Sequence, residues 1–220
     1  MWCRNILRSR TICNNPAIFT YLQCLTSNSF KNVTLKLPAR HLVASNTREC
    51  TIGDVIDQWT IDASPHACDL TTINRSKLNL TEQVAVIHAT LKSDASIEVL
   101  DSLHDASDMG LNSRQFDFVV SNPPYVPTKK IQELQPEIRI YEDLRALDGG
   151  DDGLKVIKPL LKYAAKVLKP DGCLFVEVDP THPEYIQFFT NKYTDLKLQH
   201  VHTYKDFCNN DRFVEVMKLA

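Results

Sequence analysis

The 220-residue sequence predicts an α/β fold in which a mostly parallel sheet ends in an antiparallel hairpin. From about residue 50, short apolar runs alternate with segments whose apolar residues recur at helical spacing, which is typical of α/β domains. The last two apolar runs, about residues 196–203 and 212–218, are separated only by a polar loop at 206–211. We therefore expect these two runs to pair as neighbouring antiparallel strands.

The first predicted strand and helix lie in residues 55–78. Residues 55–61 are expected to form a strand that ends at Asp62, and Ser64 and Pro65 then begin a helix as its cap and first-turn proline. The apolar residues expected to face the sheet are Ala67, Leu70, Ile73 and Leu78. Residues 84–87 follow as a short buried strand.

The second half of the domain repeats this alternation. Residues 116–120 read as a buried strand, and a helix is expected over about residues 154–168, kinked or split at Pro159. Its expected inner face consists of Leu161, Ala164, Ala165 and Leu168. Residues 169–172 are predicted to turn into a strand at 173–178, and residues 183–192 to form one more helix.

Charge divides the chain at about residue 48. Seven of its 25 Lys and Arg residues lie in residues 1–48, whereas all 27 Asp and Glu residues lie beyond them, so residues 49–220 carry a net charge of −9. The Arg-rich, acid-free start is typical of a mitochondrial transit peptide; the alternatives are an unprocessed basic tail and a cytoplasmic location. We predict a leader and linker over residues 1–48, of which 28–48 show no clear period, and a domain over 49–220.

Composition excludes several classes of protein. No apolar run approaches the eighteen or so residues that cross a bilayer, so we expect no membrane association. The net charge of −9 disfavours direct binding of nucleic acid, which needs neutralising cations. The seven cysteines form no Cys-x-x-Cys pair, and His200 and His202 have no third ligand nearby, so we predict no metal site.

The segment Asn122-Pro123-Pro124-Tyr125 directly follows the strand predicted at 116–120. Ligands bind at the carboxyl ends of strands in open α/β sheets. Two prolines fix the backbone and remove two N–H donors, so the Asn122 side-chain oxygen and the Pro123 carbonyl can accept both hydrogens of a planar –NH₂ group. Tyr125 adds an aromatic wall. The alternative interpretation is a rigid turn without a ligand.

Such a pair of acceptors suits one reaction. An amide nitrogen is a poor nucleophile because its lone pair is delocalised. Two acceptors aimed at its hydrogens raise the electron density on nitrogen and direct it towards an electrophilic methyl group.

At these residues the chain resembles the class I, S-adenosylmethionine-dependent amino-methyltransferases, and more narrowly the bacterial and organellar branch of the HemK/PrmC family. The series that carries the resemblance is Asn122-Pro123-Pro124-Tyr125-Val126, Pro136-Glu137-Ile138-Arg139, Tyr141-Glu142, Ala146-Leu147-Asp148-Gly149-Gly150, Asp152-Gly153-Leu154, Phe175-Val176-Glu177-Val178 and Asp211-Arg212-Phe213-Val214. It covers roughly residues 60–220. It implies a Rossmann-like fold and methylation of the glutamine in the Gly-Gly-Gln motif of peptide chain release factors.

The resemblance also implies roles for individual residues. Asn122 and the Pro123 carbonyl would bind the substrate amide and act in catalysis, with Pro124 and Tyr125 lining the same pocket. Asp62 would bind the ribose hydroxyls of S-adenosylmethionine, and Asn122 would meet the cofactor as well; a helix cap is the alternative role for Asp62. Glu137, Glu142 and Asp148 are expected to orient the loop or to meet the release factor.

The chain departs from the family pattern at its N-terminal side. The family's glycine-rich cofactor loop precedes the position of Asp62, but only Gly53 lies upstream here and no Gly-x-Gly occurs. The family's helical N-terminal domain is not recognisable either. We therefore expect residues 1–60 to be a truncated or foreign start, as in an isoform, an incomplete gene model or an inactive paralogue, and the sheet to lack a central strand.

Two other functions stay open on the sequence. An inactive methyltransferase-like protein that retains only partner binding is favoured by the missing glycine loop. An adenine N6-methyltransferase would share the Asn122–Tyr125 motif, but it is disfavoured by the acidic domain and the lack of a basic recognition segment.

Overall fold

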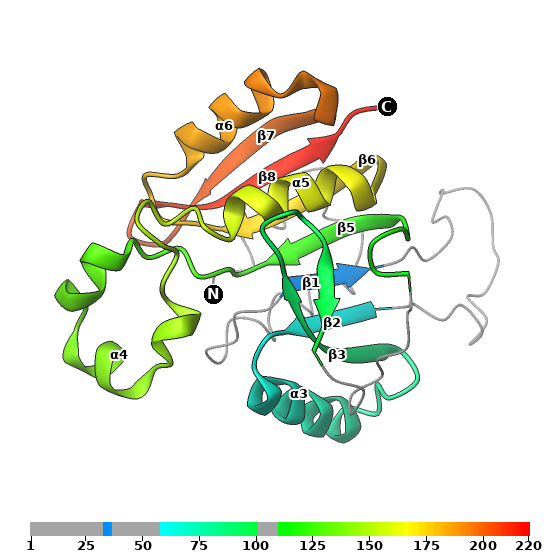
Figure 1. Cartoon of the computed structure of the whole chain (residues 1–220), viewed down its shortest axis with the longest axis vertical. Coiled ribbons are helices and arrows are strands. Elements are labelled where there is room, and N and C mark those ends of the chain that lie inside the picture. The colour runs from blue at the N-terminus through cyan, green and yellow to red at the C-terminus, as the bar shows by residue number, and fades with distance from the viewer. Residues whose placement is uncertain (1–32, 37–57, 101–109) are drawn as a thin grey trace.

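The computed structural model describes residues 33–36, 58–100 and 110–220. Eight strands form one sheet in the order β4-β3-β2-β1-β5-β6-β8-β7 (Figure 1). The strands are β1 (Val33–Lys36), β2 (Gln58–Asp62), β3 (Val84–Leu91), β4 (Ile97–Val99), β5 (Phe116–Ser121), β6 (Leu168–Glu177), β7 (Leu198–Lys205) and β8 (Asp211–Lys218). The helices are α3 (Pro65–Lys77), α4 (Pro136–Tyr141), α5 (Ile157–Val167) and α6 (Pro183–Lys192), with short 3₁₀ turns η1 (Thr128–Glu133), η2 (Leu144–Ala146) and η3 (Thr194–Leu196).

The α/β class is confirmed, but the sheet is mixed rather than mostly parallel. Of its described strand pairs, only β2–β3 and β5–β6 are parallel. β1, β4 and β8 each run against their neighbours. The remaining five strands share one direction, and β7 and β8 form the predicted C-terminal hairpin.

The predicted loss of a central strand is wrong. β1 lies between β2 and β5 and pairs antiparallel with both. Its residues belong to the segment that the sequence analysis interpreted as linker, so the sheet begins earlier in the chain than expected. The division of the chain at residue 48 remains a prediction.

Most predicted elements are confirmed at or near their expected bounds. α6 begins and ends at the predicted residues, and β2 ends at Asp62 as expected. The core between sheet and helices contains Trp59 edge-on to Phe116, with ring centroids 5.3 Å apart. The buried Tyr163 of α5 donates its hydroxyl to the Leu111 carbonyl over 2.6 Å, so its polar atom is satisfied inside the core.

The predicted inner face of α3 is wrong. Leu70, Ile73 and Leu78 are 43%, 50% and 58% exposed, and Cys68 is the fully buried residue of the helix. Hydrogen bonds explain the reversal: the Cys68 thiol lies within reach of the Asp62 carbonyl, and the Arg75 guanidinium donates to the Val84 carbonyl over 2.7 Å. The polar face therefore meets β2 and β3.

The predicted break at Pro159 is also wrong. α5 begins at Ile157, so Pro159 lies in the first turn, where a missing N–H costs no intrahelical hydrogen bond. The predicted turn at 169–172 lies within β6. There the pairing with β5 jumps from Phe116 opposite Leu168 to Phe118 opposite Cys173, and Asp171 has a positive φ of 64°. The predicted turn at 169–172 is therefore present as an irregularity within β6.

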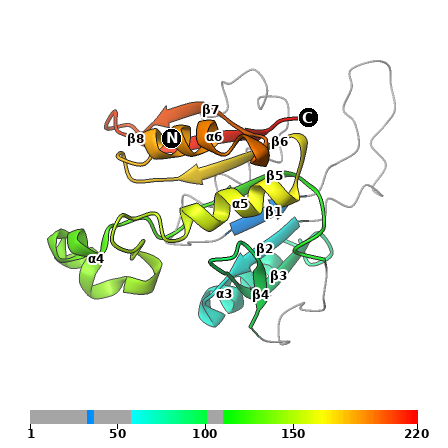
Figure 2. The ribbon, with the colours of Figure 1, turned by 45° about the horizontal axis from the view of Figure 1, so that its top comes forward.

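Residues 126–156 project from the sheet and carry η1, α4 and η2. In both views α4 lies apart from the sheet and its other helices (Figures 1 and 2). Within the described ranges, no helix has both the length and the hydropathy that spanning a bilayer demands.

Candidate functional site

Two of the predicted site residues, Asp62 and Asn122, lie at the same edge of the sheet. β1 pairs Val33 with both Ile61 of β2 and Ser121 of β5, so these two residues lie at the same level on either side of one strand. Two interstrand spacings of about 4.8 Å place their backbones about 10 Å apart. Asp62 directly follows Ile61, and Asn122 directly follows Ser121. The carboxyl ends of β2 and β5 therefore present a carboxylate and an amide at one edge of the sheet.

Asn122 has a buried acceptor without a donor. Its Oδ1 is inaccessible to solvent and accepts no hydrogen bond from the described chain, and the neighbouring Ser121 Oγ is in the same state. Leaving a buried polar atom unsatisfied costs about 1–3 kcal/mol. Pro123, buried beside it, has no N–H to offer. The arrangement fits a ligand that brings its own N–H donors.

The loop after Tyr125 is tied to the Ala146–Gly150 segment. The N–H of Val126 donates to the Leu147 carbonyl over 3.0 Å, and the N–H of Gly149 donates back to the Val126 carbonyl over 2.8 Å. Asp148 accepts from the Thr128 hydroxyl over 2.6 Å and from the Gly150 N–H, and these bonds hold the pKa of its carboxyl below the usual value. These contacts orient the loop after Tyr125, which is one of the two roles expected for Asp148.

Gly153 and His182 lie directly behind this loop. Gly153 has φ +72°, and a Cβ there would lie 2.7 Å from the His182 ring and closer still to the Tyr125 carbonyl oxygen. The buried His182 hydrogen-bonds the Asp152 carbonyl through Nε2, and burial lowers its pKa. Sequence reasoning assigned no role to His182; only Gly153, its neighbour in the fold, stood in the series that carries the family resemblance.

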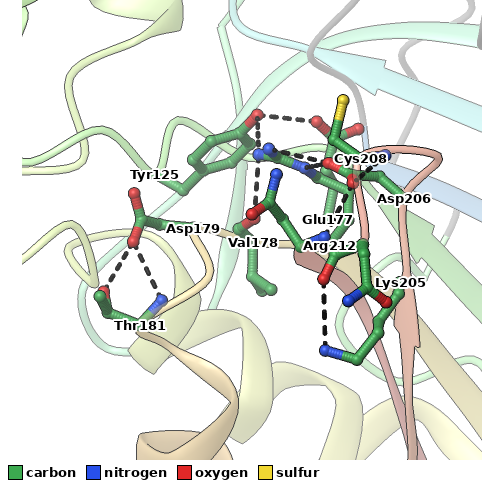
Figure 3. A network of polar contacts seen from close by, with 11 residues as sticks. Tyr125, Glu177, Val178, Asp179, Thr181, Lys205, Asp206, Cys208 and Arg212 are labelled. Atoms are coloured by element: carbon green, nitrogen blue, oxygen red, sulfur yellow. Dashed lines mark hydrogen bonds and ion pairs between the residues drawn. The ribbon is translucent and has the colours of Figure 1, made fainter.

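Tyr125 points its hydroxyl into a group of charged residues. The hydroxyl donates to Glu177 Oε1 over 2.7 Å, and Arg212 lies on its other side (Figure 3). Burial, and then the carboxylate of Glu177, raise the pKa of Tyr125, so the phenol stays protonated. The expected aromatic wall is therefore held by two residues whose roles sequence reasoning missed.

Asp62 takes part in the start of α3. Its Oδ1 accepts the Ser64 N–H over 2.7 Å, whereas Ser64 itself makes no side-chain cap hydrogen bond. The buried His88 lies opposite Asp62 in the register of β2 and β3, and its Nε2 contacts the Ala63 carbonyl over 3.2 Å. Asp62 thus takes part in starting α3, which was its alternative role. Binding of the cofactor ribose by Asp62 stays a prediction.

The partly buried position of Asp62 predicts a pH-dependent stability. Burial raises the pKa of Asp62 from 3.8 to about 6, opposed by the Ser64 N–H and by His88. Between about pH 4 and 6 the folded state therefore binds more protons than the unfolded state, so the free energy of unfolding falls as pH rises through this window. Above about pH 6 this group contributes no further change.

Asp62→Asn is expected to remove this slope, which amounts to at most about 3 kcal/mol. Asparagine retains the oxygen that accepts the Ser64 N–H, so the turn is preserved. Urea unfolding of the unmodified chain and of Asp62→Asn at several pH values measures the free energy of unfolding of each. The contributions of all other titrating groups cancel in the difference between the two proteins. Parallel pH profiles for the two proteins would contradict the assignment.

The described residues fit the two ends of an S-adenosylmethionine site. Asp62 offers a carboxylate of the kind that accepts from ribose hydroxyls, and Asn122 offers an unpartnered acceptor at the same edge. Between them lies the start of β1, and no glycine precedes Asp62 within the described residues. Within the described ranges, no group of three or more His, Cys, Asp or Glu residues is placed so that it could hold a metal ion.

Comparisons with known proteins give several curated relatives of this chain. No family model matches the chain. It is 37% identical over 158 residues to the human protein named MTRF1L release factor glutamine methyltransferase, a match that covers 72% of this chain and 44% of that protein. The release factor glutamine methyltransferase of Caulobacter vibrioides is 35% identical over 154 residues (70% and 47%), and that of Gloeobacter violaceus 32% over 157 (71% and 48%).

Among solved structures, an rRNA methylase from Streptococcus thermophilus aligns with a TM-score of 0.41 and 10% identity, covering 74% of this chain and 73% of that one. The chain spans about half the length of the curated relatives that it matches. The resemblance seen in the sequence is confirmed: over about 70% of its length, this chain is a homologue of the release factor glutamine methyltransferases.

Proposed function

We propose that the chain methylates the side-chain nitrogen of the glutamine in the Gly-Gly-Gln motif of a peptide chain release factor, with S-adenosylmethionine as cofactor. The observation that carries the proposal is the buried Oδ1 of Asn122 at the carboxyl end of β5, which has no partner among the described residues. The curated relatives named for this activity support it.

In this proposal Asn122 and Pro123 bind the glutamine amide. The Asn122 Oδ1 and the Pro123 carbonyl accept one hydrogen each, which orients the nitrogen and increases its electron density. Pro124 contributes rigidity, and the ring of Tyr125 closes one side. When bound, S-adenosylmethionine supplies a methyl group on a sulfonium sulfur, so the N–C bond forms as the C–S bond breaks.

The proton leaves the nitrogen only after this step, because the methylated amide nitrogen is cationic and strongly acidic. No side chain has to act as a general base. Asp62 is proposed to hold the ribose hydroxyls from the end of β2. The exposed Glu137 of α4, on the projecting segment, is proposed to contact the release factor together with Glu142.

Calorimetric titration of the purified full chain with S-adenosylmethionine tests the cofactor part of the proposal. We expect saturable binding at micromolar concentrations, lost in Asp62→Ala. A folded chain that takes up no cofactor would overturn the proposal that this chain is active by itself.

A second candidate function is binding of a release factor without methyl transfer. Its specific support is β1, which fills the central position of the sheet in the antiparallel direction, together with the lack of any Gly-x-Gly in the sequence. It predicts that the chain binds a release factor equally well with and without S-adenosylmethionine. Surface plasmon resonance with an immobilised release factor distinguishes the two candidates.

We also propose a mitochondrial location, supported by the seven basic and no acidic residues in positions 1–48. A fluorescent protein fused behind residues 1–48 is expected to enter mitochondria. The same fusion with Arg4, Arg8 and Arg10 replaced by glutamine is expected to stay outside. Import of both fusions would remove the basis for this assignment.

A further inference from the structure

A group of charged residues links the loop after β5 to the far hairpin of the sheet. Tyr125 follows β5, Glu177 ends β6, and Arg212 lies at the start of β8. These three residues are 35 or more positions apart in sequence, and their side chains converge at the Tyr125 hydroxyl (Figure 3).

The strongest contact joins Tyr125 to Glu177. Its length of 2.7 Å is typical of a hydroxyl that donates to a carboxylate. Arg212 Nη1 lies 3.4 Å from the same hydroxyl oxygen and 3.5 Å from the Val178 carbonyl, so it provides charge more than a tight bond. Glu177 and Arg212 also interact electrostatically with each other.

The hairpin loop between β7 and β8 holds Arg212 in place. Asp206 Oδ2 lies 3.3 Å from Arg212 Nη2, and the two side chains are only 6% and 23% exposed. Asp206 Oδ1 also accepts the N–H groups of Cys208 and Asn210, over 2.8 and 2.9 Å. The carboxylate of Asp206 is therefore fixed by the loop, and it fixes the guanidinium in turn.

We infer that Glu177 and Arg212 are positioning residues for the methyl acceptor: they fix the ring of Tyr125, and through it the direction in which Asn122 and Pro123 present their oxygens. This inference rests on the proposed function. Tyr125 lies three residues after Asn122 with two prolines between them, so a fixed ring leaves the intervening backbone little freedom. In this arrangement the Tyr125 hydroxyl donates to Glu177, so only the aromatic ring of Tyr125 contacts the substrate.

A double-mutant cycle tests this inference. Tyr125→Phe and Glu177→Leu are each expected to lower kcat/KM for a Gly-Gly-Gln peptide about tenfold, as loss of one hydrogen bond to a charged group predicts. The double variant is expected to be no worse than either single variant, because both remove the same contact. Glu177→Gln, which keeps an acceptor oxygen, is expected to restore most of the activity. Additive losses, or no rescue by glutamine, would overturn the inference.

Hydrogen exchange gives a second readout that needs no activity. The Val126 and Thr128 N–H groups are bonded to the Leu147 and Gly150 carbonyls, and they report how firmly the loop is held. Arg212→Ala and Glu177→Leu are expected to speed their exchange, while the N–H groups of β3 stay unchanged. Lys205→Ala is the matched control, since Lys205 pairs with Asp211 in the same hairpin and lies apart from Tyr125 (Figure 3).

The two readouts separate the two hypotheses. Faster exchange in Arg212→Ala, in a chain whose unmodified form transfers no methyl group, would refute the proposed function and leave the network intact. Unchanged exchange and full methylation in the same variant would refute the network and leave the proposed function intact.

Discussion

Replacing Asn122 with alanine is expected to lower the rate of glutamine methylation about 10²–10³-fold, the loss typical when one preorganised polar group is removed from a reacting centre. Asn122 Oδ1 is buried and accepts no hydrogen bond from the described residues, so its acceptor capacity is left for the substrate amide. The affinity for S-adenosylmethionine is expected to stay nearly unchanged. Radiometric transfer to a Gly-Gly-Gln peptide, with calorimetry for the cofactor, measures both effects.

Asn191→Ala is the matched control for this variant. Asn191 is exposed on α6, and its replacement is expected to leave transfer unaffected. If Asn122→Ala methylates the peptide as fast as the unmodified chain, Asn122 does not bind the amide. A drop in cofactor affinity that accounts for the whole effect would instead assign Asn122 to the cofactor alone.

Gly153→Ala is expected to give the largest loss of stability, about 3 kcal/mol, which corresponds to a fall of about 10 °C in Tm. Alanine at φ +72° is strained, and its Cβ would overlap the Tyr125 carbonyl oxygen and the His182 ring. Neither group can withdraw easily, because one is backbone and the other is buried. The same displacement would shift the loop that carries Asn122, so methylation is expected to fall as well.

Gly110→Ala separates backbone strain at a positive φ from overlap of the added Cβ with neighbouring atoms. Gly110 has nearly the same φ, +70°, but among the described residues its added Cβ would meet only the Ser113 hydroxyl, at 3.2 Å. It is therefore expected to show the backbone strain alone, about 1–2 kcal/mol, with normal methylation. Equal thermal shifts in the two variants would mean that the space behind Tyr125 is not tightly packed.

The sequence predicts those elements whose information is local. The helix of residues 183–192 begins at a proline, and the hairpin of β7 and β8 surrounds a polar loop; both are found as expected. The direction of β1 has no local signal. It depends on pairing with β2 and β5, which are distant in sequence. Helix α3 misleads for another reason, since hydrogen bonds from Cys68 and Arg75 decide which of its faces meets the sheet.

The candidate site follows the same division. Asn122 is recognisable because two prolines and a preceding strand lie beside it in sequence. Glu177 and Arg212 belong to the series that carries the family resemblance, but no local pattern gives them or His182 a role, and only the fold brings all three to the loop of Tyr125 and Gly153. Residues that support a site from behind are thus the part that sequence patterns miss.

Mass spectrometry of a release factor incubated with the full chain and isotopically labelled S-adenosylmethionine tests the central claim most directly. The account predicts one labelled methyl group on the side-chain nitrogen of the Gly-Gly-Gln glutamine, and about 10²–10³-fold slower labelling with Asn122→Ala. Label on another residue, label transferred to nucleic acid instead, or an unlabelled glutamine with a folded, cofactor-bound chain would contradict it.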